Sequence, residues 1–275
     1  MIDSLIFASI VLVAYFGASF FIPNTKPRIQ GNQASENTVL NYFAIGDSLT
    51  EGVGDSTGNG GFVPILANLI QGDYQGLIVE AANFGISGNT SNQILQRLPN
   101  EEIQASIKKA DFVTMTVGAN DILRVVSRKF PDLTVSDFDQ PRVQYKARLQ
   151  RILNEIRELN PDVPIFVLGI YNPFYLNFPT LTAMQDVIDS FNDGTKNVLN
   201  HMDNTFFIPI NALLYKGIDG KVGVAESIGR NITNDALYAG DNFHPNDIGY
   251  RLMAKAVYEV MNEQQKTWLP KGMVR

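Results

Sequence analysis

Five short apolar runs alternate with helical patterns along this chain of 275 residues. The runs are rich in β-branched and aromatic residues, and the segments between them repeat apolar residues at helical spacing. The expected strands are 39–45, 77–83, 112–117, 163–170 and 205–210, and the expected helices lie near 61–71, 91–109, 141–159, 183–202 and 246–264. Such alternation predicts an α/β fold of three α/β/α layers, in which helices cover both faces of a five-stranded parallel sheet.

A Gly-Asp-Ser turn closes the first of these runs. The run Val39–Ile45 leads directly into Gly46-Asp47-Ser48, where glycine permits a sharp turn. A serine lifted out at the carboxyl edge of a sheet, with its N–H near the start of a helix, is placed as a nucleophile. The same tripeptide also makes ordinary turns in which Asp and Ser bond to the backbone. Alone, the motif leaves both interpretations open.

A partner for this serine lies near the C-terminus, in Asp241-Asn242-Phe243-His244-Pro245. A neutral imidazole can take the proton of a serine hydroxyl near pH 7, and a carboxylate then fixes the imidazole tautomer. Three residues of separation in a turn bring Cα atoms within about 7 Å, so Asp241 can reach His244. The other histidine, His201, lies in a helical segment with no acidic residue at such a separation, and we interpret it as structural.

Two further loops follow strand-like runs and offer hydrogen-bond donors to an oxyanion. Gly85 can present its backbone N–H without obstruction by a side chain, and Asn120 can donate from its amide. Each loop alone is also typical of a simple strand-to-loop turn. Three polar turns followed by an Asp-x-x-His loop are much harder to explain in that way.

The four segments together resemble the sequence blocks of the SGNH hydrolases, also called the GDSL lipase/esterase superfamily. They read Gly46-Asp47-Ser48-Leu49, Asn83-x-Gly85-x-Ser87-Gly88, Gly118-x-Asn120-Asp121 and Asp241-x-x-His244-Pro245, within a resemblance that spans about Asn37 to Glu263. The resemblance implies that Ser48 is the nucleophile, His244 the base and Asp241 its orienting acid. It also implies an oxyanion hole made by the N–H groups of Ser48 and Gly85 and by the Asn120 side chain. The strand order it supports is flavodoxin-like, 2-1-3-4-5.

This family hydrolyses carboxylic esters and thioesters by a metal-free acyl-enzyme route. More narrowly, the chain is similar to bacterial lysophospholipase/acylhydrolase-like members with an N-terminal hydrophobic segment, so we expect a lipase-like hydrolase of small acyl esters or lipids. One alternative is an acetyl esterase that acts on cell-wall or other polysaccharide, and another is a membrane-tethered binding module with a vestigial site. Two apolar stretches, after Asn120 and from Tyr171 to Pro179, either line an acyl-chain site or pack onto the core.

Charge and composition exclude several other classes. The net charge of −6 and the pI near 5.0 argue against a nucleic-acid partner. The chain has no cysteine and two histidines, which excludes thiol catalysis, disulfides and Cys- or His-rich metal sites. Composition leaves open a site made only of carboxylates, although no dense acidic cluster indicates one. The resemblance to a metal-free family implies neither a metal nor a cofactor. The basic residues of the expected helix 141–159 are assigned to a solvated face, with contact to an anionic membrane surface as the alternative. They are Arg142, Lys146, Arg148, Arg151 and Arg157.

The N-terminus is distinct from the rest. Leu5–Ile22 is uncharged and apolar and reaches the length of about 18 residues that indicates a membrane span. A signal peptide, a retained anchor and a buried helix are the possible interpretations. We divide the chain into an anchor or signal segment (1–23), a tether (24–37), a hydrolase domain (38–265) and a C-terminal tail (266–275). Lys26 and Arg28 favour a cytoplasmic domain, whereas resemblance to anchored family members favours a membrane-anchored or secreted protein with an extracytoplasmic domain, which we expect.

Overall fold

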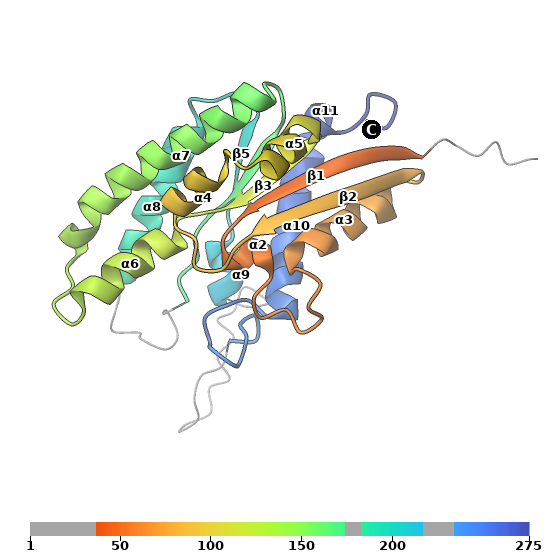
Figure 1. Cartoon of the computed structure of the whole chain (residues 1–275). Coiled ribbons are helices and arrows are strands. Elements are labelled where there is room, and N and C mark those ends of the chain that lie inside the picture. The colour runs from red at the N-terminus through yellow and green to blue at the C-terminus, as the bar shows by residue number, and fades with distance from the viewer. Residues whose placement is uncertain (1–36, 174–182, 217–233, 275) are drawn as a thin grey trace, which may run out of the picture. The chain divides into compact units, whose positions relative to one another are not determined.

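A parallel five-stranded sheet in the order β2-β1-β3-β4-β5 forms the centre of the fold (Figure 1). The computed structural model describes residues 37–173, 183–216 and 234–274. The strands are β1 (Thr38–Gly46), β2 (Leu77–Gly85), β3 (Phe112–Thr116), β4 (Ile165–Leu168) and β5 (Thr205–Ile208). The predicted fold class and the predicted strand order are both confirmed.

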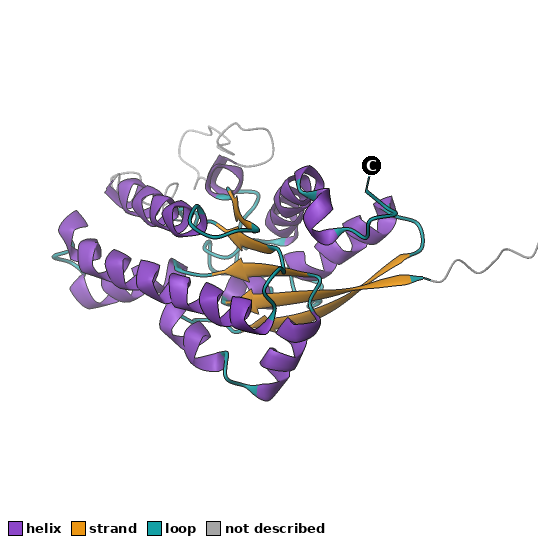
Figure 2. Cartoon of the chain, turned by 90° about the horizontal axis from the view of Figure 1, so that it is seen from above, coloured by secondary structure: helices purple, strands orange, loops and turns teal. Residues whose placement is uncertain are grey.

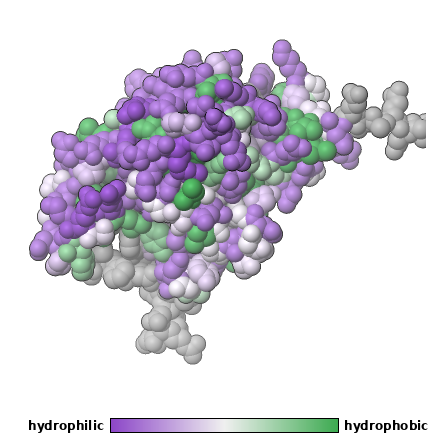
Figure 3. Space-filling view, viewed as in Figure 1, coloured by the Kyte–Doolittle hydropathy of each residue, from purple (hydrophilic) through white to green (hydrophobic). Residues whose placement is uncertain are grey.

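Helices pack on both faces of the sheet, so that the strands lie between two helical layers (Figure 2). Successive strand residues point to opposite faces: Tyr42 and Ala44 of β1 join one buried cluster, and Phe43 and Ile45 join the other. The first cluster is completed by α3 (Phe62–Asp73), α9 (Asn211–Lys216), α10 (Asp247–Glu263) and α11 (Gln265–Trp268). The second contains α4 (Ser91–Arg97), α5 (Glu101–Lys109), α6 (Ala119–Lys129), the 3-10 helix η1 (Val135–Phe138), α7 (Asp139–Leu159) and α8 (Ala183–Leu199). The surface seen in Figure 3 is mostly hydrophilic, with scattered hydrophobic residues.

The single helix predicted for 91–109 is two helices, α4 and α5, because Pro99 and Asn100 interrupt it. Proline has no N–H to donate within a helix. The Asn100 side chain accepts hydrogen bonds from the N–H groups of Glu102 and Ile103 and thereby caps the start of α5. In the segment 266–274, Trp268 is buried and its ring lies edge-on to Tyr74 and Phe112.

The predicted anchor or signal segment (1–23), all but the last residue of the predicted tether (24–37), and most of the second apolar stretch (174–179) lie outside the described residues. Within the described ranges, no helix is both long enough and apolar enough to cross a bilayer.

The end of β2 packs tightly against α2 (Ser48–Glu51), the short helix that follows β1. A Cβ atom built on Gly85 would lie 2.1 Å from the backbone nitrogen of Glu51 and 2.5 Å from the carbonyl carbon of Thr50. Both are backbone atoms and cannot rotate away. The absence of a side chain at Gly85 therefore allows β2 and the Ser48 helix to approach each other.

We expect Gly85→Ala to lower the melting temperature, because the new methyl group separates β2 from α2. Gly72→Ala is the matched control: Gly72 lies in α3 with open space around its Cα, and alanine in a helix is favoured over glycine by roughly 0.5–1 kcal/mol. That control should melt at or above the wild-type temperature in a calorimetric scan. A Gly85→Ala protein as stable as wild type would contradict this account of the packing.

Candidate active site

The three polar turns predicted from the sequence meet at the carboxyl edge of the sheet. Ser48 and Asn120 follow β1 and β3, Gly85 is the last residue of β2, and β1 lies between the other two strands. The chain leaves β1 for β2 on one side and reaches β3 on the other, so this edge is the topological switch point, where open α/β sheets bind ligands.

A chain of two hydrogen bonds links Ser48, His244 and Asp241. The His244 Nε2 atom lies 2.9 Å from Ser48 Oγ, and its Nδ1 atom lies 2.6 Å from Asp241 Oδ2. Ser48 is only 6% exposed, and it is the first residue of α2. His201, in contrast, has its Nδ1 atom 2.6 Å from the carbonyl oxygen of Asn197. Of the two histidines, the structure therefore places His244 beside the serine.

Backbone hydrogen bonds fix the loop that carries the acid and the base. The N–H of Tyr238 donates to the His244 carbonyl, and the N–H of Asn242 donates to the Tyr238 carbonyl. Asp241 Oδ1 accepts from the N–H groups of Phe243 (2.8 Å) and His244 (3.0 Å). Burial opposes ionisation of Asp241, but the hydrogen bonds from His244 and Phe243 outweigh it and hold its pKa below the ordinary value. Asp241 is thus kept as a carboxylate.

Asp47 is a part of the site whose role the sequence analysis did not identify. Its Oδ1 atom accepts from the N–H of Leu49 (3.1 Å), which caps α2, and from the hydroxyl of Thr116 on β3 (2.7 Å). The carboxyl is almost fully buried, and burial raises its pKa above the ordinary value. Asp47 therefore joins the nucleophile turn to the neighbouring strand. Its place in the Gly-Asp-Ser turn was a signal for capping, but Thr116 had no signal beyond being polar at a strand end.

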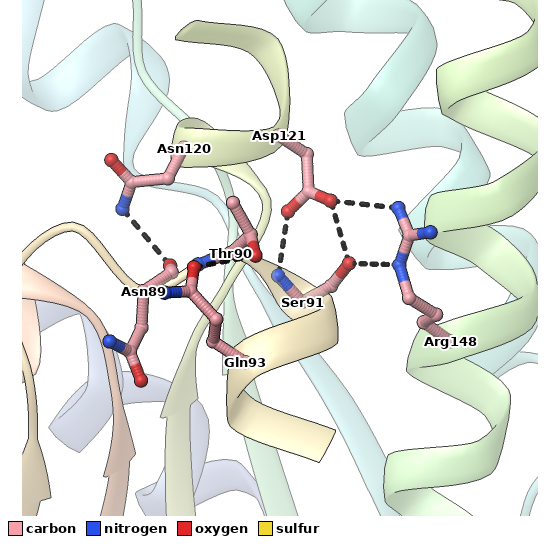
Figure 4. A network of polar contacts seen from close by, with 7 residues as sticks. All are labelled: Asn89, Thr90, Ser91, Gln93, Asn120, Asp121 and Arg148. Carbon is pink, nitrogen blue, oxygen red and sulfur yellow. Dashed lines mark hydrogen bonds and ion pairs between the residues drawn. The ribbon is translucent and has the colours of Figure 1, made fainter. Parts of the chain in front are cut away.

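Two of the three residues predicted as oxyanion donors, Gly85 and Asn120, have acceptors within the protein. The N–H of Gly85 donates to Asn83 Oδ1 (2.9 Å), and Asn120 Nδ2 donates to the Asn89 carbonyl (3.1 Å; Figure 4). A side-chain amide carries two N–H bonds, so Asn120 retains a second donor for a substrate. Gly85 has one N–H, which must leave Asn83 to reach an oxyanion. The assignment of Gly85 as an oxyanion donor stays a prediction.

A cavity opens beside Ser48, and most of its walls are apolar. Ile122 and Leu123 of α6 come from the first apolar stretch, and Tyr171 and Pro173 begin the second. The remaining lining residues are Asp47, Ser48, Leu49, Ala119, Asn120, Ile170, Met184, Ile188 and Phe243. Phe130, farther along the first stretch, is 76% exposed. Part of each predicted stretch therefore borders the serine, and Ile122 also belongs to the buried core.

In the described part of the chain, no three His, Asp or Glu side chains gather as a metal ion would require. The site therefore consists of a hydrogen-bonded serine, histidine and aspartate beside an apolar cavity and an amide donor. These groups are the ones that acyl transfer needs.

Comparison with known proteins gives a consistent result. A model of the GDSL-like Lipase/Acylhydrolase family matches residues 44–252. The chain is 32% identical over 246 residues to the uncharacterized protein YpmR of Bacillus subtilis, covering 90% of this chain and 89% of YpmR. It is 25% identical over 220 residues to an acetylxylan esterase of Geobacillus stearothermophilus, covering 77% and 89% of the two chains. The crystal structure of the lipase Lip_vut3 from a goat rumen metagenome is similar, with a TM-score of 0.66, 27% identity and coverage of 80% and 96%.

The buried Asp47 leads to a prediction about pH. Burial sets the folded-state pKa of Asp47 above the unfolded value, which is about 3.9 for aspartate. Stability from this group is fully present below the unfolded pKa and is lost as pH rises through the folded pKa. The Asp47→Asn side chain stays neutral and can accept the same hydrogen bonds. The free energy of unfolding of this variant should therefore increase relative to that of wild type as pH rises from about 4 to about 8.

Urea denaturation at several pH values measures this difference. Asp132→Asn, on the exposed segment between α6 and η1, controls for the loss of one negative charge from the whole protein. A difference between Asp47→Asn and wild type that stays constant or shrinks as pH rises would show that burial does not govern Asp47.

Proposed function

The chain belongs to the GDSL-like lipase/acylhydrolase family, and we propose that it is a serine esterase that cleaves acyl esters through an acyl-enzyme intermediate. The observation that carries this proposal is the continuous hydrogen-bonded path from Ser48 Oγ through His244 to Asp241, with separations of 2.9 and 2.6 Å. A serine hydroxyl becomes a useful nucleophile only when a base is positioned to take its proton.

The proposed reaction follows from this geometry. His244 Nε2 takes the proton of Ser48 while Ser48 Oγ attacks the ester carbonyl carbon, and Asp241 stabilises the resulting imidazolium. The negative charge on the former carbonyl oxygen is stabilised by the second N–H of Asn120 and by the N–H of Ser48 at the start of α2. Collapse of this intermediate breaks the ester C–O bond, and His244 returns the proton to the departing alcohol. Water, deprotonated by His244, then hydrolyses the acyl-serine and regenerates Ser48.

The cavity beside Ser48 supports a lipid-like acyl ester as substrate. Its walls include the aliphatic side chains of Leu123, Ile170 and Ile188, and transfer of an acyl chain from water to such walls is favourable by about 0.8 kcal/mol per buried CH₂ group. Similarity to the lipase Lip_vut3 agrees with this choice. Similarity to an acetylxylan esterase favours the second candidate, an acetyl esterase that acts on a polysaccharide.

We also propose that the uncharged segment Leu5–Ile22 attaches the protein to a membrane, or directs its export, with the enzyme domain outside the cytoplasm. The length and composition of the segment support attachment or export, and the resemblance to anchored family members supports the orientation.

The triad is tested by three single substitutions assayed on a short water-soluble ester. Ser48→Ala and His244→Ala should each lose nearly all turnover while the protein remains folded, because these groups serve the chemistry. His201→Ala is the matched control and should keep most of the wild-type turnover, since His201 contacts the Asn197 carbonyl rather than the serine. If His201→Ala is as inactive as His244→Ala in a folded protein, the assigned base is wrong. A wild-type protein with no esterase activity would favour the binding module.

The cavity is tested by filling it. Leu123→Trp should sharply lower kcat/KM for long acyl esters and leave acetyl esters much less affected, because the indole occupies the space proposed for the chain. Val143→Trp, on the exposed side of α7, makes a comparable change away from the cavity. It should leave kcat/KM unchanged for both long acyl esters and acetyl esters. A panel of esters from acetyl to palmitoyl gives the measurement. A wild-type optimum at acetyl that Leu123→Trp leaves unchanged would support the acetyl esterase instead.

A further inference from the structure

A buried polar network lies next to Asn120 and joins the three helices α4, α6 and α7 (Figure 4). Its centre is the carboxylate of Asp121 in the first turn of α6. That carboxylate accepts from the N–H of Ser91 (2.8 Å), from the hydroxyl of Ser91 (2.7 Å) and from Arg148 Nη2 (2.9 Å). The Nε atom of Arg148 also donates to Ser91 Oγ, at 2.7 Å. Arg148, which the sequence analysis assigned to a solvated face of the helix, is therefore turned inward.

Each group in this network has one defined role. The guanidinium can only donate and the ionised carboxylate can only accept, so the Ser91 hydroxyl accepts from Arg148 and donates to Asp121. Ser91 and Asp121 are buried, and the Arg148 side chain is 22% exposed. Charge-assisted hydrogen bonds in such surroundings are short and directional. The network therefore fixes the start of α4, the start of α6 and the middle of α7 in one mutual arrangement.

The same network fixes both partners of the Asn120 hydrogen bond. Asn120 precedes Asp121 on α6, and its acceptor, the Asn89 carbonyl, lies two residues before Ser91. Arg97 holds the same loop from its other side, through the Asn89 side chain (3.2 Å) and the Phe84 carbonyl (2.8 Å). With one amide hydrogen committed to Asn89, the direction of the other is determined. It is the hydrogen that the proposed mechanism uses.

We propose that Arg148 and Ser91 are positioning residues that act through Asp121 to hold the Asn120 amide ready for the oxyanion. This inference rests on the proposed function. Apolar packing already joins these helices, because Ile122 of α6 and Leu149 of α7 share one buried cluster with Ile94 of α4. The polar network adds a fixed direction for the amide. Preorganised donors stabilise a transition state because they need no reorientation during the reaction.

The test uses Arg148→Lys and Ser91→Ala in the full-length protein. Lysine keeps the charge but cannot bridge Asp121 and Ser91 as a planar guanidinium does. Ser91→Ala removes the hydroxyl and retains the N–H that bonds Asp121. Each should lower kcat about tenfold with little change in KM, which is part of the roughly 10²–10³-fold cost of deleting one oxyanion donor. Arg151→Met, an exposed change on the same helix, is the control and should leave kcat and KM unchanged.

The decisive comparison repeats both substitutions in an Asn120→Ala background. Residues that act through one donor are strongly non-additive, so each should then lower kcat less than about twofold. A full tenfold effect in that background would mean that the network does not act through Asn120, and melting temperatures lowered with kcat unchanged would mean a purely structural role. Either result overturns the inference. Failure of the proposed function is separate, because it would appear as turnover retained by Ser48→Ala.

Discussion

The hydrogen bond between Ser48 Oγ and His244 Nε2 joins residues 196 positions apart, and the rest of the fold serves to make that contact possible. Ser48 is placed by β1 and His244 by the loop before α10, two elements that meet because α10 packs beside α3 on one face of the sheet. Hydrogen bonds between the segment after Ser48 and α10 also hold these two elements together. The hydroxyl of Tyr250 donates to the Val53 carbonyl (2.6 Å), and Asp247 accepts from the N–H and hydroxyl of Ser56 (2.8 and 2.5 Å). The segment after the nucleophile is thereby attached to the helix that follows the base.

Two buried acidic side chains, Asp47 and Asp121, support this site near the end of β3. Asp47 connects the nucleophile turn to Thr116 at the end of β3, and Asp121 connects the helix after β3 to α4 and α7. A buried carboxylate is costly unless its hydrogen bonds are made. Within the described residues, every buried side-chain nitrogen and oxygen has a hydrogen-bond partner. Such satisfied networks favour a single arrangement of the groups they join, which is the property that a preorganised catalytic site requires.

The sequence was most informative where local pattern and function coincide. Alternating apolar runs predicted the five strands and both helical layers, and the four motifs predicted that Ser48, Asn120 and His244 would lie at one edge of the sheet.

Other features depend on contacts between distant segments. The inward turn of Arg148 could not be predicted, because its partners Ser91 and Asp121 lie 57 and 27 positions away and no periodicity within α7 distinguishes it from its exposed neighbours. The hydrogen bond from Gly85 to Asn83 is local, and it was missed because Gly85 was selected for its accessible N–H. The break between α4 and α5 did have a local signal, the Pro99-Asn100 pair, which the spacing of apolar residues obscured.

The central claim is that Ser48 is made nucleophilic by its contact with His244. A fluorophosphonate reports this state directly, because it bonds covalently to a serine that is activated in this way and spares ordinary serine hydroxyl groups. The protein is incubated with the probe beside a known serine hydrolase, and its intact mass and tryptic peptides are then measured by mass spectrometry. We expect one adduct per chain, on the peptide that contains Ser48. An unmodified protein in a reaction where the known hydrolase is fully labelled, or an adduct on another residue, would contradict it.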